Sequence, residues 1–452
     1  MKKYVIGLDI GTSSIKGILA RVDEREEFVT GRCGFDYVTD DRGTVEISAG
    51  SYMNSCMTLL KKLSSALPDD GELLAVSTAT ASGNILFLDE NYNPISTIVN
   101  WQDKRTNDEP DTILGADFDK EAYFKSTGWA FDGKTFPLAT LSRLKVNNPE
   151  LFSKNNKLCM STEYMYYCLT GEWGLSTSAG TPFYLIDQQT GKYRTDILEK
   201  FGLKAEQLPP VLPVGTIVGK VTEDGNKLSG LPVGTPLIAG TFDHPSAARG
   251  VGVLKEGQML LSCGTSWVGF YPIDDREKAV KNKLLIDPFL SENNGPWAGM
   301  VSLASVAAKI EDYIRMYVCN EGNVYKTFEK YSSESEIGAG GLKLTLSDAD
   351  NAEEIKKYPK RHIARAIMEC VVGMLQKDFE RLEAGGVKAT SAVMVGGPSE
   401  CPLWTKIIEQ ITGMTVVIRH GSFAGSVGSA SVAGIAAGVF ENEAQSAEFF
   451  NS

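Results

Sequence analysis

A carboxylate, two hydroxyls and a lysine lie close together near the start of the chain, in GLDIGTSSIKG. An apolar strand ends at Asp9, where a buried carboxylate would be costly unless it met a cation, directly or through water. Three small residues follow: Gly11, Thr12 and Ser13. Backbone N–H groups and hydroxyls there could converge on an anion, with Lys16 as a positive charge. The segment therefore fits a phosphate-binding loop, although a hairpin turn whose glycine adopts a positive φ fits it as well.

Two more glycine turns follow strands in the second half of the chain. SCGTSW contains Gly264 and Thr265, a Gly-Thr pair that follows an apolar strand just as the Gly-Thr pair of DIGTSS does. Two such turns on facing domains could clasp the phosphates of one nucleotide. GGPSECPLW could let a flat base approach the backbone, at Gly396, Gly397 and Ser399. Taken alone, that third turn is better explained as an ordinary strand-to-helix connection.

A second carboxylate follows an apolar run in PLIAGTFDHPSAARG. Asp243 comes just before what reads as the first turn of a helix, with Pro245 well placed near its start. Helix capping explains Asp243, and so does service as a general base for a hydroxyl nucleophile. His244 is its neighbour and a candidate substrate contact, although a lone histidine is more often structural.

The segment NWQDKRT gathers aromatic and bidentate side chains after the apolar stretch PISTIV. Carbohydrates are bound by aromatic faces and by bidentate side chains on their hydroxyls. Four residues make a candidate polyol site: Trp101, Gln102, Asp103 and Arg105. The alternative is an exposed charged turn.

Strands alternating with helices must position these residues, which indicates an α/β fold. Residues 4–10 and 72–80 read as strands around a helix at 53–67. The second half repeats the pattern, with a strand, turn and strand at 257–272 and a long amphipathic helix ended by glycines at 361–386. We expect duplicated α/β domains, residues 1–244 and residues 245–452.

Composition narrows the class of protein. The 452 residues carry a formal net charge of −12, which argues against a broad nucleic-acid or anionic-membrane surface. Eight cysteines without a CxxC pair and only three histidines make a zinc site or a disulfide framework improbable. The N-terminus does not read as a signal peptide, and no stretch has the length of a membrane span. We expect a cytoplasmic protein.

Taken together and in this order, these motifs resemble the FGGY family of carbohydrate kinases, within the actin, Hsp70 and hexokinase superfamily. The resemblance extends through LTGEWGLSTSAGTPFYLIDQQTGKY, the helix HIARAIMECVVGML and the terminal GSVGSASVAGIAAG. It implies two RNase H-like domains of the actin/hexokinase type with a deep interdomain cleft. It also implies ATP-dependent phosphorylation of a small sugar or polyol, most naturally a ketose of the pentulose type, with Mg²⁺. Neither nucleic acid nor a membrane is an expected partner, and a homodimer is left open.

The resemblance also implies residue roles. Asp243 matches the family's catalytic aspartate, and Asp9 would hold Mg²⁺, with Asp243 as a second carboxylate toward the metal. The phosphates would meet the turn at Gly11, Thr12 and Ser13 and, from the second domain, Gly264 and Thr265. The adenosine turn matches Gly396, Gly397 and Ser399. The WxDxR element matches Trp101, Asp103 and Arg105.

Two departures from the family pattern leave the substrate open. ATASGN stands where xylulose-type kinases carry Gln-Met-His-Gly and glycerol kinases carry Arg-Glu, so Ala81 and Ser82 would form a smaller, less polar pocket wall. The Pro-Tyr-Leu-x-Gly-Glu-Arg segment of many relatives is absent from the second half. Two alternatives stand beside the kinase. An actin- or Hsp70-like nucleotide-dependent switch would share the phosphate loops, and the missing segments would suit a degenerate kinase that senses sugar.

Overall fold

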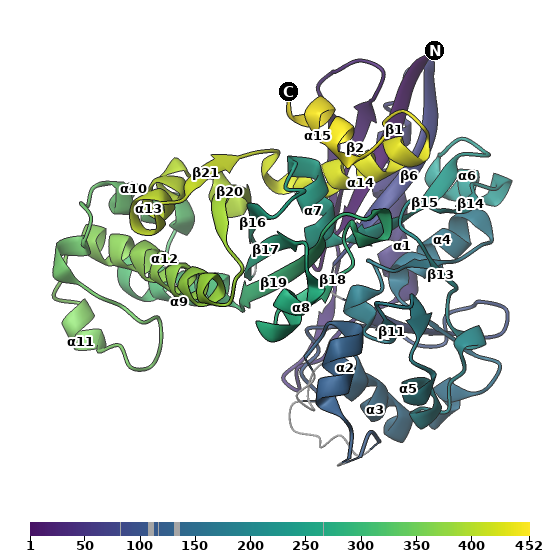
Figure 1. Ribbon diagram of the computed structural model, residues 1–452, viewed down its shortest axis with the longest axis horizontal. Coiled ribbons are helices and arrows are strands. Elements are labelled where there is room, and N and C mark those ends of the chain that lie inside the picture. The colour runs from purple at the N-terminus through teal and green to yellow at the C-terminus, as the bar shows by residue number, and fades with distance from the viewer. Residues whose placement is uncertain (82, 107–112, 116, 131–135, 265) are drawn as a thin grey trace. The chain divides into compact units, whose positions relative to one another are not determined.

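The chain forms two compact units in the computed structural model, which describes residues 1–81, 83–106, 113–115, 117–130, 136–264 and 266–452. Unit 1 comprises Met1–Leu254, Lys283–Trp297 and Phe423–Ser452, and unit 2 comprises Lys255–Asn282 and Ala298–Ser422 (Figure 1). The units thus interleave along the chain, whereas we expected one boundary near residue 244. Two late segments of the chain thus pack with the first unit. Division into domains 1–244 and 245–452 stays a prediction.

A six-stranded sheet forms the centre of unit 1, in the order β14-β15-β6-β1-β2-β3. Its strands are β1 (Lys2–Ile10), β2 (Ser14–Arg21), β3 (Val29–Gly34), β6 (Gly71–Thr80), β14 (Ile217–Lys220) and β15 (Pro236–Phe242). β1 and β2 form an antiparallel hairpin, whereas β6 runs parallel to both β1 and β15. Three strands therefore end at the same edge of the sheet.

The alternation of side chains along β1 assigns its residues to two cores. Tyr4, Ile6 and Leu8 pack in one core with residues of α1 (Ala49–Ser64). Val5 packs in another core with residues of α14 (Ala424–Ala436). Since Asp9 is four residues from Val5, its side chain lies on the α14 face of the sheet.

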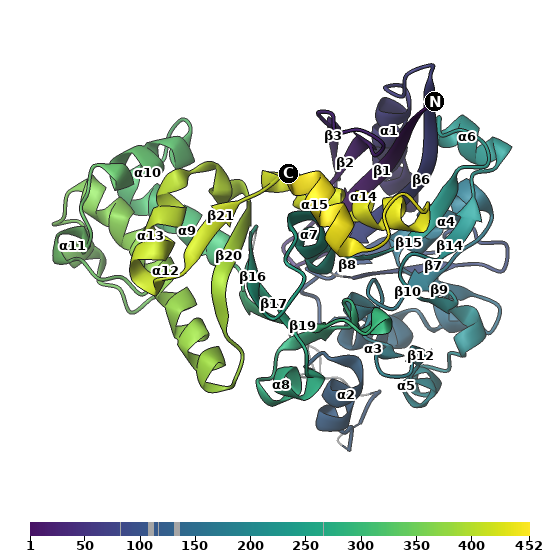
Figure 2. The same cartoon turned by 45° about the horizontal axis from the view of Figure 1, so that its top comes forward.

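The C-terminal helix α14 packs closely on β1 and on α7 (Asp243–Val251), and Figures 1 and 2 both show it beside the N-terminal strands. Small residues allow this approach: a Cβ atom on Gly7 would overlap the backbone at Ser426, and one on Gly428 would overlap the Ser246 carbonyl. The Ser429 hydroxyl adds a hydrogen bond of 2.8 Å to the Leu8 carbonyl oxygen. Helix α15 (Glu443–Asn451) ends the chain. These contacts are the physical reason that the C-terminal segment belongs to unit 1.

The rest of unit 1 is built around a five-stranded sheet in the order β4-β5-β8-β7-β9. The strands are β4 (Val38–Thr39), β5 (Val45–Ile47), β7 (Asn84–Leu88), β8 (Ile98–Asn100) and β9 (Lys157–Cys159). Helices α2 (Lys120–Thr127), α3 (Leu138–Asn147), α4 (Ser161–Thr170), α5 (Thr195–Lys200) and α6 (Glu223–Ser229) accompany them. Two short ladders pair β10 (Leu175–Ser176) with β13 (Val211–Leu212) and β11 (Ile186–Asp187) with β12 (Lys192–Tyr193). The segment with β18 (Leu285–Asp287) joins this unit through the hydrogen bond from Ile286 N to Gly128 O.

The strands of unit 2 lie in the order β19-β17-β16-β20-β21 within a six-stranded sheet that also contains β18. The strands of this unit are β16 (Gly257–Cys263), β17 (Trp267–Ile273), β19 (Trp297–Leu303), β20 (Ala389–Gly396) and β21 (Thr415–Ile418). Its helices are α8 (Arg276–Lys281), α9 (Val306–Tyr313), α10 (Val324–Ser333), α11 (Ala352–Ile355), α12 (Lys360–Ala384) and α13 (Pro402–Thr412). Over the described part of the chain, no helix combines the length and apolar character needed to cross a membrane.

The two units share one strand pattern. β16 pairs antiparallel with β17 and parallel with β20, just as β1 pairs antiparallel with β2 and parallel with β6. The turns at Gly11 and Gly264 connect the first two strands of each set. The repeated strand, turn and strand that the sequence predicts is therefore present in both units.

Candidate active site

Parallel pairing in unit 1 brings three predicted site segments to one sheet edge. Thr80 is opposite Ile10 in the β1–β6 ladder and opposite Phe242 in the β6–β15 ladder. Ala81, which is buried, extends this pairing by donating its N–H to the Ile10 carbonyl oxygen at 2.8 Å. The segments that contain Asp9, Ala81 and Asp243 thus converge, as their placement after apolar strands predicts.

Asp9 is a largely buried carboxylate whose nearest cation is Lys16 on the neighbouring strand. The Lys16 ammonium Nζ lies 3.8 Å from Asp9 Oδ2, and the Asp9 side chain is 13% exposed. Burial raises the pKa of Asp9 to about 6, and the charge of Asp243 adds to this rise while Lys16 opposes it. An ion pair at this distance compensates the buried charge only in part, so the position suits a further cation.

Gly425 on α14 makes the space that the Asp9 carboxylate occupies. A Cβ atom at position 425 would lie 2.8 Å from both Asp9 Cγ and Asp9 Oδ2. Nothing local in the sequence links residues 9 and 425, so sequence reasoning missed this contact. The Gly- and Ser-rich composition of the terminal segment was the only available signal.

The turn after β1 is a hairpin turn and still keeps the predicted loop residues together. The Gly11 N–H donates to the Ser14 carbonyl oxygen at 3.0 Å. Gly11 does not adopt a positive φ, so the expected reason for glycine in a hairpin is wrong; a Cβ atom there would instead lie 3.1 Å from the Ser14 carbonyl oxygen. Thr12 Oγ1 accepts a hydrogen bond of 3.1 Å from Trp101 Nε1, whereas Ser13 is exposed. The predicted phosphate loop and the candidate sugar site therefore touch within unit 1.

Asp243 is the first residue of α7, one position beyond the expected cap. The N-cap is Phe242, which makes no side-chain hydrogen bond, and Asp243 Oδ1 accepts from the His244 N–H at 2.7 Å. The Asp243 side chain is 27% exposed, and His244 Nε2 lies 3.8 Å from its Oδ1. Asp243 is thus a partly accessible carboxylate at the positive end of a helix.

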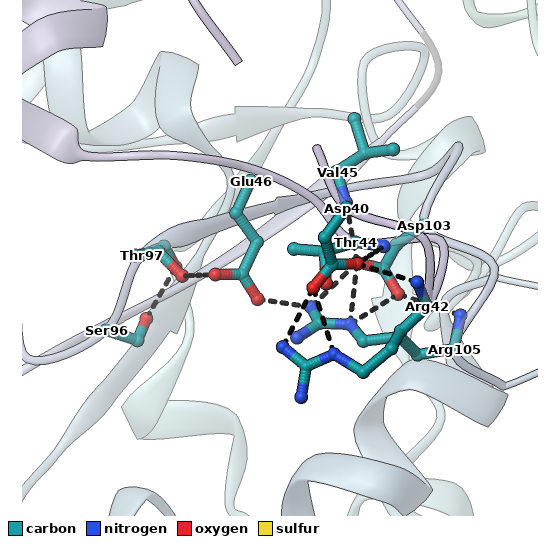
Figure 3. Close-up of polar contacts among 9 residues, drawn as sticks. All are labelled: Asp40, Arg42, Thr44, Val45, Glu46, Ser96, Thr97, Asp103 and Arg105. Atoms are coloured by element: carbon teal, nitrogen blue, oxygen red, sulfur yellow. Dashed lines mark hydrogen bonds and ion pairs between the residues drawn. The ribbon is translucent and has the colours of Figure 1, made fainter. Parts of the chain in front are cut away.

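The WQDKRT segment is held by ion pairs of Arg105 with Asp103 and Glu46, which Figure 3 shows. The Asp103 side chain is 1% exposed and accepts from Val45 N at 3.0 Å and from Arg105 Nε at 2.9 Å. Arg105 also pairs with Glu46 on β5. The alternative of an exposed charged turn is therefore wrong for Asp103 and Arg105, because these two side chains bind each other and anchor the loop. Trp101 and Gln102 remain half-buried, and sugar binding by all four residues stays a prediction.

The remaining predicted residues of unit 2 that the structure describes lie in two turns, one after β20 and one between β16 and β17. Gly396 has a φ of 95°, and a Cβ atom there would overlap the Cys263 carbonyl, so this position requires glycine. Ser399 Oγ donates to the Gly396 carbonyl oxygen at 2.6 Å, and Gly397 begins the same short helix. The Gly264 N–H donates to Ser266 O at 3.1 Å. Ser82 and Thr265 lie outside the described residues.

A profile of the FGGY family of carbohydrate kinases, N-terminal domain, matches residues 4–250, which is more than half of the 452 residues. The chain belongs to the FGGY family of carbohydrate kinases. It is therefore a sugar kinase, a phosphotransferase whose substrate is a small carbohydrate, as its motifs predict. This membership confirms the kinase interpretation over a nucleotide-dependent switch.

Individual relatives support the same family and fold. The autoinducer-2 kinase of Salmonella typhimurium is 24% identical over 98% of this chain and 88% of its own length. A xylulose kinase from Rhodospirillum rubrum aligns with a TM-score of 0.80 and 21% identity, covering 96% of this chain and 90% of its own. A Plasmodium falciparum glycerol kinase with ADP aligns with a TM-score of 0.84 and 15% identity, covering 99% and 92%. The expected actin/hexokinase-type α/β fold is thus confirmed.

Proposed function

We propose that this kinase transfers the γ-phosphoryl group of ATP to a hydroxyl of a ketose of the pentulose type, with Asp243 as the general base. The observation that carries the proposal is the convergence of Asp9 and Asp243 at one sheet edge, where the charge of Asp243 raises the pKa of Asp9. A partly exposed carboxylate beside a second, buried one fits proton removal next to a metal-bound phosphate.

In this mechanism Asp243 accepts the proton of the attacking hydroxyl. The N–H of His244, bound to Asp243 Oδ1, fixes the orientation of the carboxylate. His244 itself, 20% exposed, is proposed as a substrate contact. The hydroxyl would thereby gain nucleophilic character as it meets the γ-phosphorus.

The donor set at this edge fits Mg²⁺, which is bound in kinases by one or two carboxylates together with substrate phosphates. Asp9 would hold the ion with Asp243 as the second carboxylate, and Gly425 leaves room for the Asp9 oxygens. When bound, Mg²⁺ neutralises charge on the phosphate oxygens. Lys16 and the turn at Gly11, Thr12 and Ser13 are proposed to bind phosphate. The proposed nucleotide contacts of unit 2 are Gly264, Thr265, Gly396, Gly397 and Ser399.

The proposed sugar site combines an aromatic face with a small apolar wall. Trp101 and Gln102 would contact the sugar, and Ala81 with Ser82 would admit an acceptor that polar residues there would exclude. The relatives named above act on different acceptors, so family membership does not specify the acceptor. The pentulose is proposed in addition to the kinase reaction. Among the described residues all eight cysteines are free, which agrees with the proposed cytoplasmic location.

A coupled assay of ADP release tests the proposal on a panel of pentuloses, hexoses, polyols, sugar acids and autoinducer-2. We expect a pentulose to give the highest kcat/KM, and Asp243→Asn to reduce kcat by at least about 10³-fold while ATP still binds, because the base is lost. Full activity of Asp243→Asn overturns the role of Asp243. A higher kcat/KM for another class of acceptor overturns the pentulose.

A further inference from the structure

Asp287 is a fully buried carboxylate that the proposed mechanism does not use. It ends β18, has 0% exposure, and accepts hydrogen bonds through both oxygens. Thr181 Oγ1 donates to Oδ2 at 2.8 Å, and Ser178 Oγ lies 3.0 Å from the same oxygen. The Phe289 N–H donates to Oδ1 at 2.8 Å. Burial raises the pKa of Asp287 to about 6, and the hydrogen bonds that it accepts oppose this rise. Asp287 is therefore an ionised carboxylate at pH values above about 6.

The Ser178 hydroxyl connects Asp287 to the residue before the proposed base. Ser178 Oγ accepts a hydrogen bond of 3.2 Å from the N–H of Phe242. An ionised carboxylate only accepts, so the Ser178 hydroxyl must donate to Asp287 and keeps its lone pairs for Phe242. Because the N-cap of α7 has no side-chain hydrogen bond, Ser178 holds the backbone at the point where Asp243 begins the helix.

Arg249 gives the same carboxylate a second connection to α7. Its guanidinium is 1% exposed, lies 4.7 Å from the centre of the Phe289 ring, and donates through Nη2 to the Phe289 carbonyl oxygen at 2.7 Å. Because the Phe289 N–H is bound to Asp287, Phe289 connects the Asp287 carboxylate to Arg249 on α7. Glu443 is a further carboxylate beside Arg249, with Oε1 3.7 Å from its Nε.

We propose that Asp287 is a positioning residue for Asp243, which it orients through the Ser178 hydroxyl and the Phe242 backbone. This inference rests on the proposed role of Asp243 as the base. A displacement of about 1 Å at a reacting group can cost about 100-fold in rate, so a link one residue from the base should act on kcat. A purely structural cluster would instead affect stability whichever of its hydrogen bonds is removed.

Ser178 and Thr181 provide a matched pair of variants that separates these roles. Both hydroxyls donate to Asp287, but of the two only Ser178 Oγ is bonded to the Phe242 N–H. At pH 8 we expect Ser178→Ala to lower kcat by about 10-fold with the KM for ATP unchanged, and Thr181→Val to keep kcat within about 2-fold at a similar loss of thermal stability. Equal kcat values for the two variants would overturn the proposal.

Asp287→Asn is the second test, because it keeps the shape of the side chain while removing the charge. We expect its kcat to fall as far as that of Ser178→Ala, again with the KM for ATP unchanged. Wild-type kcat in Asp287→Asn would contradict the inference. Asp243→Asn measured in parallel separates the two proposals: if it is inactive while Ser178→Ala matches Thr181→Val, only the positioning role fails, and if it is active, the proposed base itself fails.

Discussion

Asp9 and Lys16 face each other across the β1–β2 hairpin, with Lys16 Nζ 3.8 Å from Asp9 Oδ2. Directly opposed residues of an antiparallel pair share a face of the sheet, so the turn between them brings the lysine to the carboxylate. The positive charge of Lys16 therefore stabilises the ionised Asp9 carboxylate even when no nucleotide is bound.

Replacing Lys16 by methionine should raise the pKa of Asp9 above about 6 in the protein without nucleotide, because Lys16 opposes the effect of burial. Carboxyl carbon chemical shifts followed by NMR against pH measure this value, with Asp9→Asn assigning the signal. An unchanged pKa would show that the two charges do not interact.

Adding a methyl group at position 425 should impair the Asp9 site. In Gly425→Ala the new Cβ would lie 2.8 Å from the Asp9 carboxylate carbon, and we expect kcat to fall at least about 10-fold and the Mg²⁺ concentration for half-maximal rate to rise. The control is Gly373→Ala on α12, where a Cβ has no neighbour within 4 Å. That variant should be as active as wild type and more stable by about 0.5–1 kcal/mol. Wild-type Mg²⁺ dependence in Gly425→Ala would contradict the role given to Gly425.

Removing Arg105 should destabilise the protein far more than removing Arg42. Arg105→Ala leaves Asp103, 1% exposed, without its partner and should cost about 3 kcal/mol of unfolding free energy. Arg42 pairs with Asp40, but its side chain is 81% exposed, so Arg42→Ala should cost less than about 1 kcal/mol. Urea unfolding compares the two variants; Figure 3 shows both arginines with their carboxylate partners. Similar losses would mean that burial of Asp103 does not govern the energy of this cluster.

The free energy of unfolding of the wild-type protein should fall, relative to that of Glu163→Gln, as the pH rises. Burial raises the pKa of Glu163 from 4.5 to about 7, although its carboxylate accepts the Met160 N–H at 2.9 Å. The folded protein thus holds this proton more tightly than the unfolded chain. The contribution is complete below pH 4.5 and is lost as the pH rises through about 7, a change of about 3 kcal/mol at 1.36 kcal/mol per unit.

Unfolding free energies at pH 4.5, 6 and 8 measure this difference. Glu172→Gln, at an exposed glutamate just after the same helix, is the control and should track wild type at each pH. A constant difference between wild type and Glu163→Gln would rule out the linkage.

Local sequence patterns predicted the strand ends and the turns correctly. Apolar runs ending at Asp9 and at Phe242, each followed by small residues or a helix signal, are sufficient to locate the two carboxylates at strand ends. Parallel pairing then brings them together, because the carboxyl ends of parallel strands share one edge. The repeated Gly-Thr-Ser turn likewise indicated a duplicated fold, which the paired hairpins of the two units confirm.

Roles set by distant contacts could not be predicted in this way. The Arg105 side chain turns toward Glu46, on a strand more than fifty residues earlier, while it also pairs with the buried Asp103. The contacts of these two side chains in the structure are therefore with the protein itself. Asp287 meets Ser178 across 109 residues, and no spacing rule connects them.

The sequence by itself determined which residues end strands, which turns need small residues and which family the chain belongs to, since these depend on local periodicity and ordered motifs. Only the tertiary structure decided that α14 returns to β1 and that Gly425 makes room for Asp9. It also decided that Ser178 joins Asp287 to the backbone before Asp243. Such contacts depend on how closely two backbones approach and on which buried donors meet which acceptors, and both are properties of the packed fold.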